Sequence, residues 1–371
     1  MHRIHRGLVA IGAAIVLSLG LMSPPAATGS PAAHSRDHGL GENHDLVENM
    51  AREAFERAVT PTECAPTPVD AYVGGLAAAM TAEQFAFVLA HPDMLSVPLY
   101  DSLFFGTEGD PDYALDSHAR QLQHTFRDLT RFWSDIRSDD IQVMAMHGDV
   151  LLDAGRITAT LTAMTQAGVI APMTDSEIAL EAQTVADFMA AQGDFHDNPL
   201  WTLNAYAFSG EGYLDPLIAA VPDKIVFGDG ILAMYDALGV GDVGPRVIMS
   251  HEFAHHIQIE LGTFETGPAD RAEATRRTEL MADAMATYHG VHKKGLTLNR
   301  KRAVDALLSF SAIGDCLFDS PAHHGTPLQR QRASAWGADL ATAARPRSQV
   351  LPAETVIAGF DAALPAIVAG S

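Results

Sequence analysis

The segment 250–262, SHEFAHHIQIELG, constrains the fold most, because it combines the pattern of a buried helix with three histidines. Its apolar residues recur on one helical face, at Val247, Ala254, Ile257 and Leu261. Gly262 follows, in a position where helices commonly end. Burying an imidazole without a partner costs free energy, so these histidines need partners.

His251, Glu252 and His255 form the pattern HExxH within this helix. Two histidines four residues apart lie on one helical face, so both imidazoles can reach one metal ion. Glu252 is rotated by about 100° around the axis, where it can act on water without binding the ion. Zinc suits such ligands and keeps an open position. We predict Zn²⁺ on His251 and His255, Glu252 as general base, and His256 off this face as a supporting or surface residue.

A third zinc ligand has to come from another element. Residues 268–289 read as a second helix, with Pro268 near its first turn and Gly290 just past its end. On it Glu279 and Asp283 are four apart and share one face. We expect Glu279 to bind the metal and Asp283 to accept a hydrogen bond from a ligand histidine. Two alternatives stay open at this point. Glu265, in the intervening loop, is another possible ligand. The other alternative is ion pairing, of Glu279 with Arg276 or of Asp283 with a surface lysine.

These motifs also resemble a known group of enzymes. HEFAHHIQ followed by ELMAD is similar to the gluzincin arrangement, HExxH then ExxxD on the next helix, as in thermolysin. More narrowly, HEFAHHIQ, ELMADA, AIGD and HGTPLQR in that order resemble the neutral zinc metallopeptidases of bacteria, over about residues 201–338. The resemblance implies a zinc site with Glu252 as general base and with His251, His255 and Glu279 as ligands.

The chain departs from that family pattern at two positions. Ala254 stands where the family usually has glycine, and Ala284 stands where it usually has cysteine. Neither position should contact the metal, so the departures bear on family membership more than on the chemistry. A metzincin is excluded, because Gln258 and Leu261 occupy the places of its further glycine and histidine.

The order of the predicted elements indicates an α+β fold. Helical patterns over 81–92 and 117–136 precede strand-like segments at 140–148, 201–210 and 223–230. We predict a zincin-like metallopeptidase fold, in which a small mixed sheet accompanies the HExxH helix. The expected division is a signal peptide at 1–33, a helical N-terminal region at 34–138 and a catalytic domain at 139–371.

The first 33 residues have the features of a signal peptide. A basic start, MHRIHR, precedes an uncharged apolar run at 7–22 and then small residues and prolines. The run is short for a membrane span, so we expect no stable membrane anchor after processing. The protein should be secreted or extracytoplasmic. In that environment Cys64 and Cys316 either form one disulfide, which export favours, or remain buried thiols.

The composition limits the partners. A formal net charge of −22 at pH 7 argues against nucleic acid, which is bound through basic patches. With 47% hydrophobic residues the chain can bury a substantial core. This net charge is compatible with a peptide or protein substrate, and the family resemblance implies such a substrate.

Four residues outside the motif are candidates for contact with substrate. His324 precedes the capping sequence TPLQ and would donate to a developing oxyanion, or it has only a structural role at the start of a helix. Asn204 would help a strand pair with an extended peptide, or that strand is an ordinary core strand. Tyr206 and Tyr288 are rival oxyanion donors, with packed core tyrosines as the alternative.

Together these features predict an exported zinc-dependent endopeptidase. One alternative is an exported zinc hydrolase that uses the same site on a non-protein substrate such as a cell-wall crosslink. Another is a binding or scaffold protein with a structural metal, which would need a fourth ligand such as His289 to close the site. The intact Glu252 favours catalysis, because a structural site has no use for a base.

Overall fold

The computed structural model describes residues 67–298, 302, 324–343, 346 and 348–369. The predicted signal peptide and both cysteines lie outside these residues. Among the described residues no single helix is long and apolar enough to cross a membrane. Only the bent pair α2 (Pro68–Ala78) and α3 (Ala82–Ala90), joined at 108°, satisfies length and composition together.

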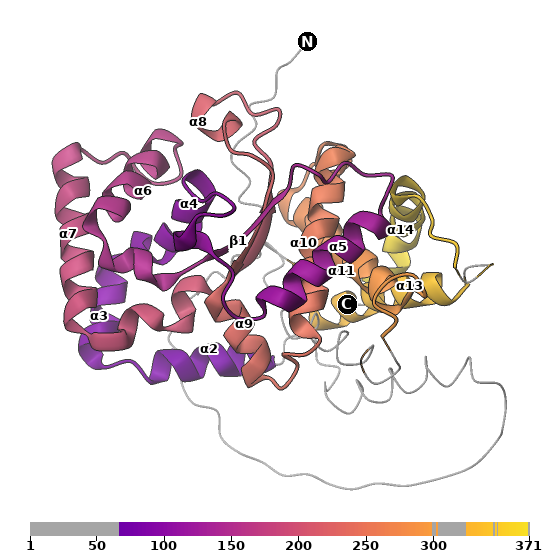
Figure 1. Cartoon of the computed structure of the whole chain (residues 1–371), viewed down its shortest axis with the longest axis horizontal. Helices are drawn as coiled ribbons and strands as arrows, with labels where there is room; N and C mark the ends of the chain where they lie inside the picture. The colour runs from indigo at the N-terminus through magenta and orange to yellow at the C-terminus, as the bar shows by residue number, and fades with distance from the viewer. Residues whose placement is uncertain (1–66, 299–301, 303–323, 344–345, 347, 370–371) are drawn as a thin grey trace, which may run out of the picture.

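A three-stranded sheet lies at the centre of the molecule (Figure 1). Its strands are β1 (Gln142–Met146), β2 (Ala205–Phe208) and β3 (Lys224–Gly228), in the order β1-β3-β2. β1 runs parallel to β3, whereas β2 runs antiparallel to it. The described chain is mostly helical with one small mixed sheet, which fits the predicted α+β class.

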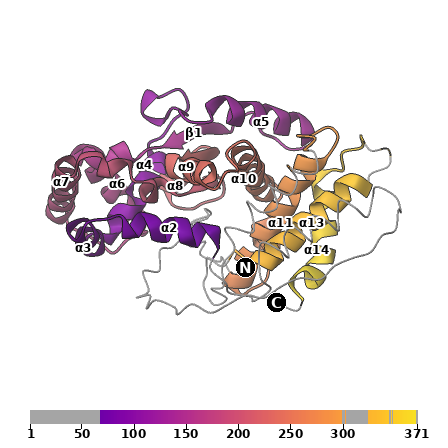
Figure 2. The same cartoon turned by 90° about the horizontal axis from the view of Figure 1, so that it is seen from below.

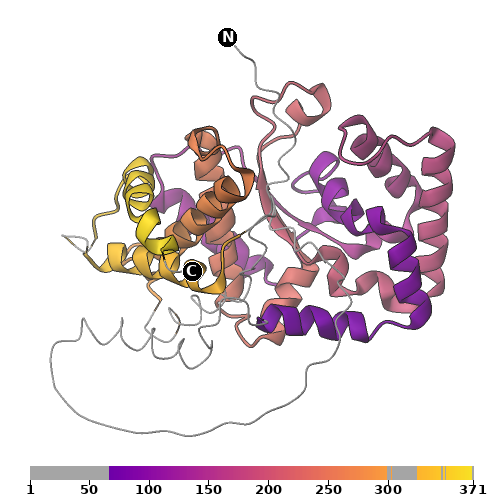
Figure 3. The same ribbon diagram turned by 180° about the vertical axis from the view of Figure 1, so that it is seen from behind.

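One face of the sheet is covered by helices from the first half of the chain (Figures 1 and 3). They are α3, α4 (Val97–Phe104), α6 (Ala154–Gln166) and α7 (Asp175–Ala191). Met144, Tyr206 and Val226 point into this core. The sequence did not predict α6 and α7, whose apolar periodicity is diluted by small and polar residues.

The other face packs against α5 (Ala119–Phe132) and α10 (Gly244–Glu260), behind which lie α11, α13 and α14 (Figure 2). Val143, Ile225 and Phe227 belong to this second core. Successive β3 residues therefore enter opposite cores, as a pleated strand buried on both faces requires. α5, from the predicted N-terminal region, shares its core with α10, so the two regions meet directly.

The helices that follow α10 are arranged so that their buried faces meet. They are α11 (Arg271–Val291), α13 (Pro327–Ala343) and α14 (Ala353–Val368). The two short helices α8 (Pro216–Ala219) and α9 (Asp229–Ala237) flank β3 in the chain.

Two of the predicted helix boundaries are confirmed by local geometry. α10 ends just before Gly262, whose φ of 63° lies in the left-handed region that glycine adopts without strain. Thr326 and Gln329 form the predicted capping box at the start of α13. The predicted end of the next helix at Gly290 is wrong, because Gly290 lies within α11. There a Cβ would approach the Leu298 side chain to 3.3 Å, so glycine serves packing.

A buried lysine joins β3 to α4. Lys224 is 2% exposed, and its Nζ donates to the carbonyl oxygens of Ser102, Leu103 and Gly106 at 3.0, 2.7 and 2.6 Å. These carbonyls lie at the C-terminal end of α4, where helical carbonyls lack partners. Burial lowers the pKa of the ammonium to about 8, and Asp101 opposes that shift. The lysine therefore replaces solvent at a buried helix end.

Replacing Lys224 by methionine should destabilise the protein. Three buried carbonyls would lose a charged donor, although the Ser102 carbonyl keeps the Gly106 N–H, and we expect the free energy of unfolding at pH 7 to fall by about 3 kcal/mol. Urea denaturation measures this, with Lys293→Met as control because Lys293 is exposed. A loss below about 1 kcal/mol at position 224 would contradict the role given to the ammonium.

Candidate metal centre

Two adjacent helices bring three of the predicted ligands together. His251 and His255 lie on α10 and Glu279 on α11, and all three are buried. The two Nε2 atoms are 3.1 Å apart. Glu279 places Oε2 3.3 Å from Nε2 of His251 and Oε1 3.3 Å from Nε2 of His255. One ligand atom from each residue thus falls within 4.8 Å of the others.

The two alternatives to this ligand set are not supported by the geometry. Arg276 forms its ion pair with Glu273, in the first turn of α11, and not with Glu279. Glu265 lies in the short helix η6 (Thr263–Thr266) and is not part of the converging group. The choice of Glu279 therefore agrees with the positions of the side chains.

Each histidine is held in orientation through its other ring nitrogen. Nδ1 of His251 lies 2.9 Å from Oδ1 of Asp283, the carboxylate predicted for this role. Nδ1 of His255 lies 2.9 Å from Oε1 of Gln258. Gln258 donates in turn to the backbone carbonyl of Thr278 at 2.8 Å. Both Nε2 atoms consequently face Glu279, and metal-binding histidines are commonly oriented in this way by a contact to the other ring nitrogen.

The electrostatics of this group favour a shared positive charge. Burial lowers the pKa of His251, but Asp283 and Glu279 outweigh it and raise the pKa to about 10. Burial alone would raise the pKa of Glu279, yet His255, His324 and His251 bring it well below its usual value. The buried carboxylates thus favour a positive charge between the two imidazoles. Two imidazoles and one carboxylate are also a donor set that zinc prefers, so the residues fit a divalent ion.

Glu252 differs from the other buried acids at this centre. It is 1% exposed, and neither carboxylate oxygen has a hydrogen-bond partner among the described residues. Burial raises the pKa of Glu252, although the nearby His251 and His255 and the backbone N–H of Ala207 partly oppose the shift. A buried carboxylate without a partner is costly, and such groups commonly mark functional sites.

Arg330 is a residue of the centre that the sequence reading did not identify. It is 1% exposed on α13, and its Nε and Nη2 donate to the two oxygens of Asp283, each at 2.7 Å. Nη2 also lies 3.9 Å from Oε2 of Glu279. The sequence feature that could have pointed to Arg330 is its place in the HGTPLQR motif, three residues after Pro327 at the start of a helix. The chain Arg330–Asp283–His251 thus connects α13, α11 and α10.

The four candidate substrate contacts have different positions. His324 is buried and close enough to Glu279 to lower the pKa of that carboxyl. Asn204 is buried, its carbonyl accepts from the Gly228 N–H at 2.9 Å, and its Oδ1 has no hydrogen-bond partner within the described residues.

Tyr206 hydrogen-bonds to Ser102 at 2.8 Å in the opposite core. The hydroxyl of Tyr288 accepts from the Leu351 N–H at 3.0 Å. The tyrosines are therefore packed structural residues, which was the alternative to a catalytic role for them.

His289, the candidate fourth ligand of a structural site, lies apart from the three ligands. Its Nδ1 is 3.0 Å from the Ser250 hydroxyl, and burial lowers its pKa to about 3. Within the part of the chain that is described, the converging group at this centre contains three ligands and does not include His289.

The edge strand β2 adjoins this centre. Among the described strands β2 pairs with β3 alone, and it packs against α10. Because the Gly228 N–H donates to the Asn204 carbonyl, the alternation of an antiparallel pair turns the backbone groups of Ala205 and Ala207 away from β3. The effect of the Ala207 N–H on Glu252 agrees with that direction. The outward edge of β2 therefore lies beside the candidate base.

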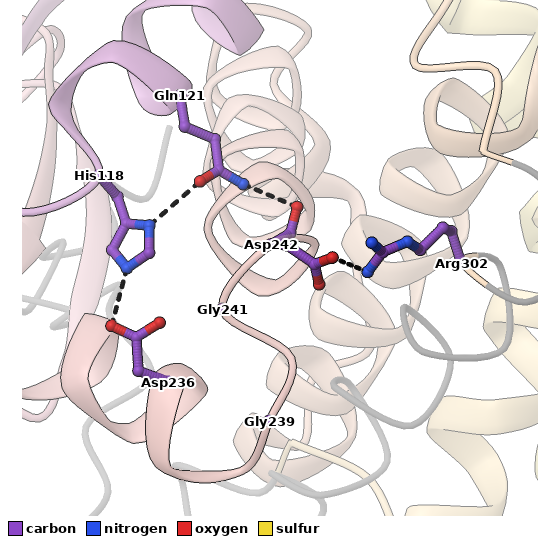
Figure 4. Close-up of a pocket in the computed structure, with 7 residues that line it drawn as sticks. All are labelled: His118, Gln121, Asp236, Gly239, Gly241, Asp242 and Arg302. Atoms are coloured by element: carbon purple, nitrogen blue, oxygen red, sulfur yellow. Dashed lines mark hydrogen bonds and ion pairs between the residues drawn. The ribbon is translucent and has the colours of Figure 1, made fainter.

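A separate pocket of about 630 Å³ is lined by His118, Gln121, Asp236, Gly239, Gly241, Asp242 and Arg302 (Figure 4). Its polar groups bond to one another: His118 contacts Gln121 at 3.1 Å and Asp236 at 3.0 Å, and Gln121 donates to the Asp242 carbonyl at 2.9 Å. None of the metal-centre residues lines it, so it is not part of this site.

Comparison with known proteins adds no assignment, since no family model, curated protein or solved structure matches the chain.

Replacing Arg330 by methionine should destabilise the protein strongly. The substitution leaves the Asp283 carboxylate buried with less compensating charge, so we expect the free energy of unfolding to fall by about 3–5 kcal/mol. Chemical denaturation at pH 7 measures the change. Arg131→Met is the control, because its side chain is 73% exposed and its ion pair lies on the surface. Equal stability of the two variants would show that Arg330 does not balance Asp283.

Proposed function

We propose that this protein is an exported zinc-dependent metallopeptidase of the gluzincin type, with a zincin-like catalytic fold. One observation carries the proposal. Three buried donors, His251, His255 and Glu279, converge beside a buried carboxylate, Glu252, that has no hydrogen-bond partner among the described residues. A purely structural cluster accounts for the three donors, but it gives no reason to bury the Glu252 carboxylate, which costs free energy.

In this proposal His251, His255 and Glu279 hold the zinc ion, and Asp283 and Gln258 keep the two imidazoles in their metal-binding tautomers. When bound, zinc supplies Lewis acidity, which polarises a carbonyl group and makes a water molecule more acidic. The ligand set leaves at least one coordination position for exchange, because it contains three protein ligands.

Glu252 is the proposed general base and acid. It would take a proton from the attacking water and return it to the leaving amine. Its raised pKa suits both steps, because a carboxyl nearer neutrality holds the proton between them. Among the described side chains none hydrogen-bonds to the carboxylate, so no side-chain contact has to break before it acts.

The substrate would bind along the outward edge of β2. The backbone groups of Ala205 and Ala207 face away from β3 and can pair with an extended peptide as an added strand. The uncommitted Oδ1 of Asn204 would accept from that peptide, and His324 would donate to the oxyanion from beside Glu279. An extended backbone is what this edge selects, so a peptide suits it better than a compact substrate.

Glu252→Gln should separate chemistry from metal binding. The amide keeps the shape of the side chain but cannot accept the proton of the attacking water, so we expect cleavage of casein to fall by at least about 10³-fold. Zinc content should stay the same, because Glu252 is not a ligand. Glu273→Gln, a change at a partly exposed position in the first turn of α11, is the control. Full activity of the Glu252 variant would refute the assigned role.

Removing one ligand should abolish metal binding at this centre. His251→Ala takes away an imidazole from a three-ligand site, and we expect loss of its zinc and of activity, measured by elemental analysis and by casein digestion with and without a chelator. An unchanged zinc content in His251→Ala would contradict the ligand assignment. Activity on cell-wall crosslinks in place of casein would favour the non-protein hydrolase.

A further inference from the structure

A second group of possible ligands lies on the opposite side of α10. Asp223, His256 and Glu260 bring one ligand atom each within 4.8 Å of the others. Asp223 directly precedes β3, whereas His256 and Glu260 lie four apart at the C-terminal end of α10. None of them belongs to the centre formed by His251 and Glu279.

The hydrogen bonds of His256 define which of its ring nitrogens is available. His256 is 2% exposed, and its Nε2 lies 2.7 Å from the backbone carbonyl of Arg137. A carbonyl only accepts, so Nε2 carries a proton and Nδ1 of the neutral ring carries the lone pair. The same contact orients metal-binding histidines elsewhere, through the nitrogen that does not bind the metal.

The lone pair on Nδ1 faces a second acceptor. Oδ2 of Asp223 lies 3.6 Å from Nδ1 of His256, which is beyond a hydrogen bond. Asp223 is 9% exposed, and this oxygen is buried without a hydrogen-bond partner in the described part of the chain. Two acceptors that face each other across this gap, one of them a carboxylate, require a bridging cation or a proton.

The charges around the cluster also call for a cation. Arg137 lies 3.1 Å from Asp140, 3.4 Å from Glu260 and 3.5 Å from Glu211. With Asp223, four carboxylates surround one guanidinium, whose side chain is 53% exposed. Arg137 thus forms ion pairs with Asp140, Glu211 and Glu260, whereas Oδ2 of Asp223 has no hydrogen-bond partner among the described residues.

We propose that Asp223, His256 and Glu260 form a second divalent-cation site, distinct from the centre on the other side of α10. One imidazole and two carboxylates suit a transition-metal ion of the zinc class better than calcium or magnesium, which prefer oxygen alone. The bound ion would tie the start of β3 to the end of α10. It therefore has a structural role, and it does not depend on the proposed peptidase activity.

Zinc stoichiometry of the full chain tests this proposal. After chelator treatment and equilibrium dialysis against zinc chloride, His256→Gln should bind one equivalent less than the unaltered protein. Asp223→Asn, which changes shape less, should show the same loss. The rise in melting temperature caused by zinc should also be smaller by about 5 °C in both variants, for zinc at about 100-fold above its dissociation constant.

Two comparisons make the result specific. His196→Gln is the matched control: His196, Asp149 and Asp197 have similar spacing, but both carboxylates are exposed, so zinc binding should not change. The double variant His251→Ala/His255→Ala lacks the first centre and should still bind the equivalent that His256→Gln loses. Unchanged stoichiometry in both His256→Gln and Asp223→Asn would overturn the second site. Loss confined to the double variant would support only the first.

Discussion

The burial of ionised side chains around His251 is the constraint on which the rest of this structure depends. A carboxylate taken out of water is stable only with compensating charge and hydrogen bonds. Asp283 receives both from Arg330 and lies against His251, while Glu279 lies against two imidazoles. Since these groups come from α10, α11 and α13, the packing of three helices and the charge balance of the centre require each other.

The sequence predicted the parts of this centre that depend on helical periodicity. His251 and His255 share a face because they are four residues apart, and Glu279 and Asp283 do so for the same reason. Their placement on adjacent helices is what the structure adds. The α+β class followed in the same way, because the three strand segments carry enough alternation to be recognised, although β2 is shorter than its predicted range.

The remainder could not be read from the sequence, because it depends on contacts between distant segments. Apart from its place in HGTPLQR, nothing local distinguishes Arg330 from a surface arginine, since it is buried against Asp283, 47 residues earlier in the chain. His256 was expected to be a supporting or surface residue, yet the Arg137 carbonyl and Asp223 enclose it. Lys224, in a short apolar strand, acquires its role only when α4 ends against it.

The position of Arg330 has a consequence for the order in which the molecule assembles. Asp283 lacks its guanidinium partner until α13 has docked, and α13 follows α11 across more than thirty residues. A nascent chain that ends before this arginine has α10 and α11 but cannot bury their acidic side chains together. The centre is thus completed late in synthesis, and a truncated product lacks it even though every candidate ligand is present.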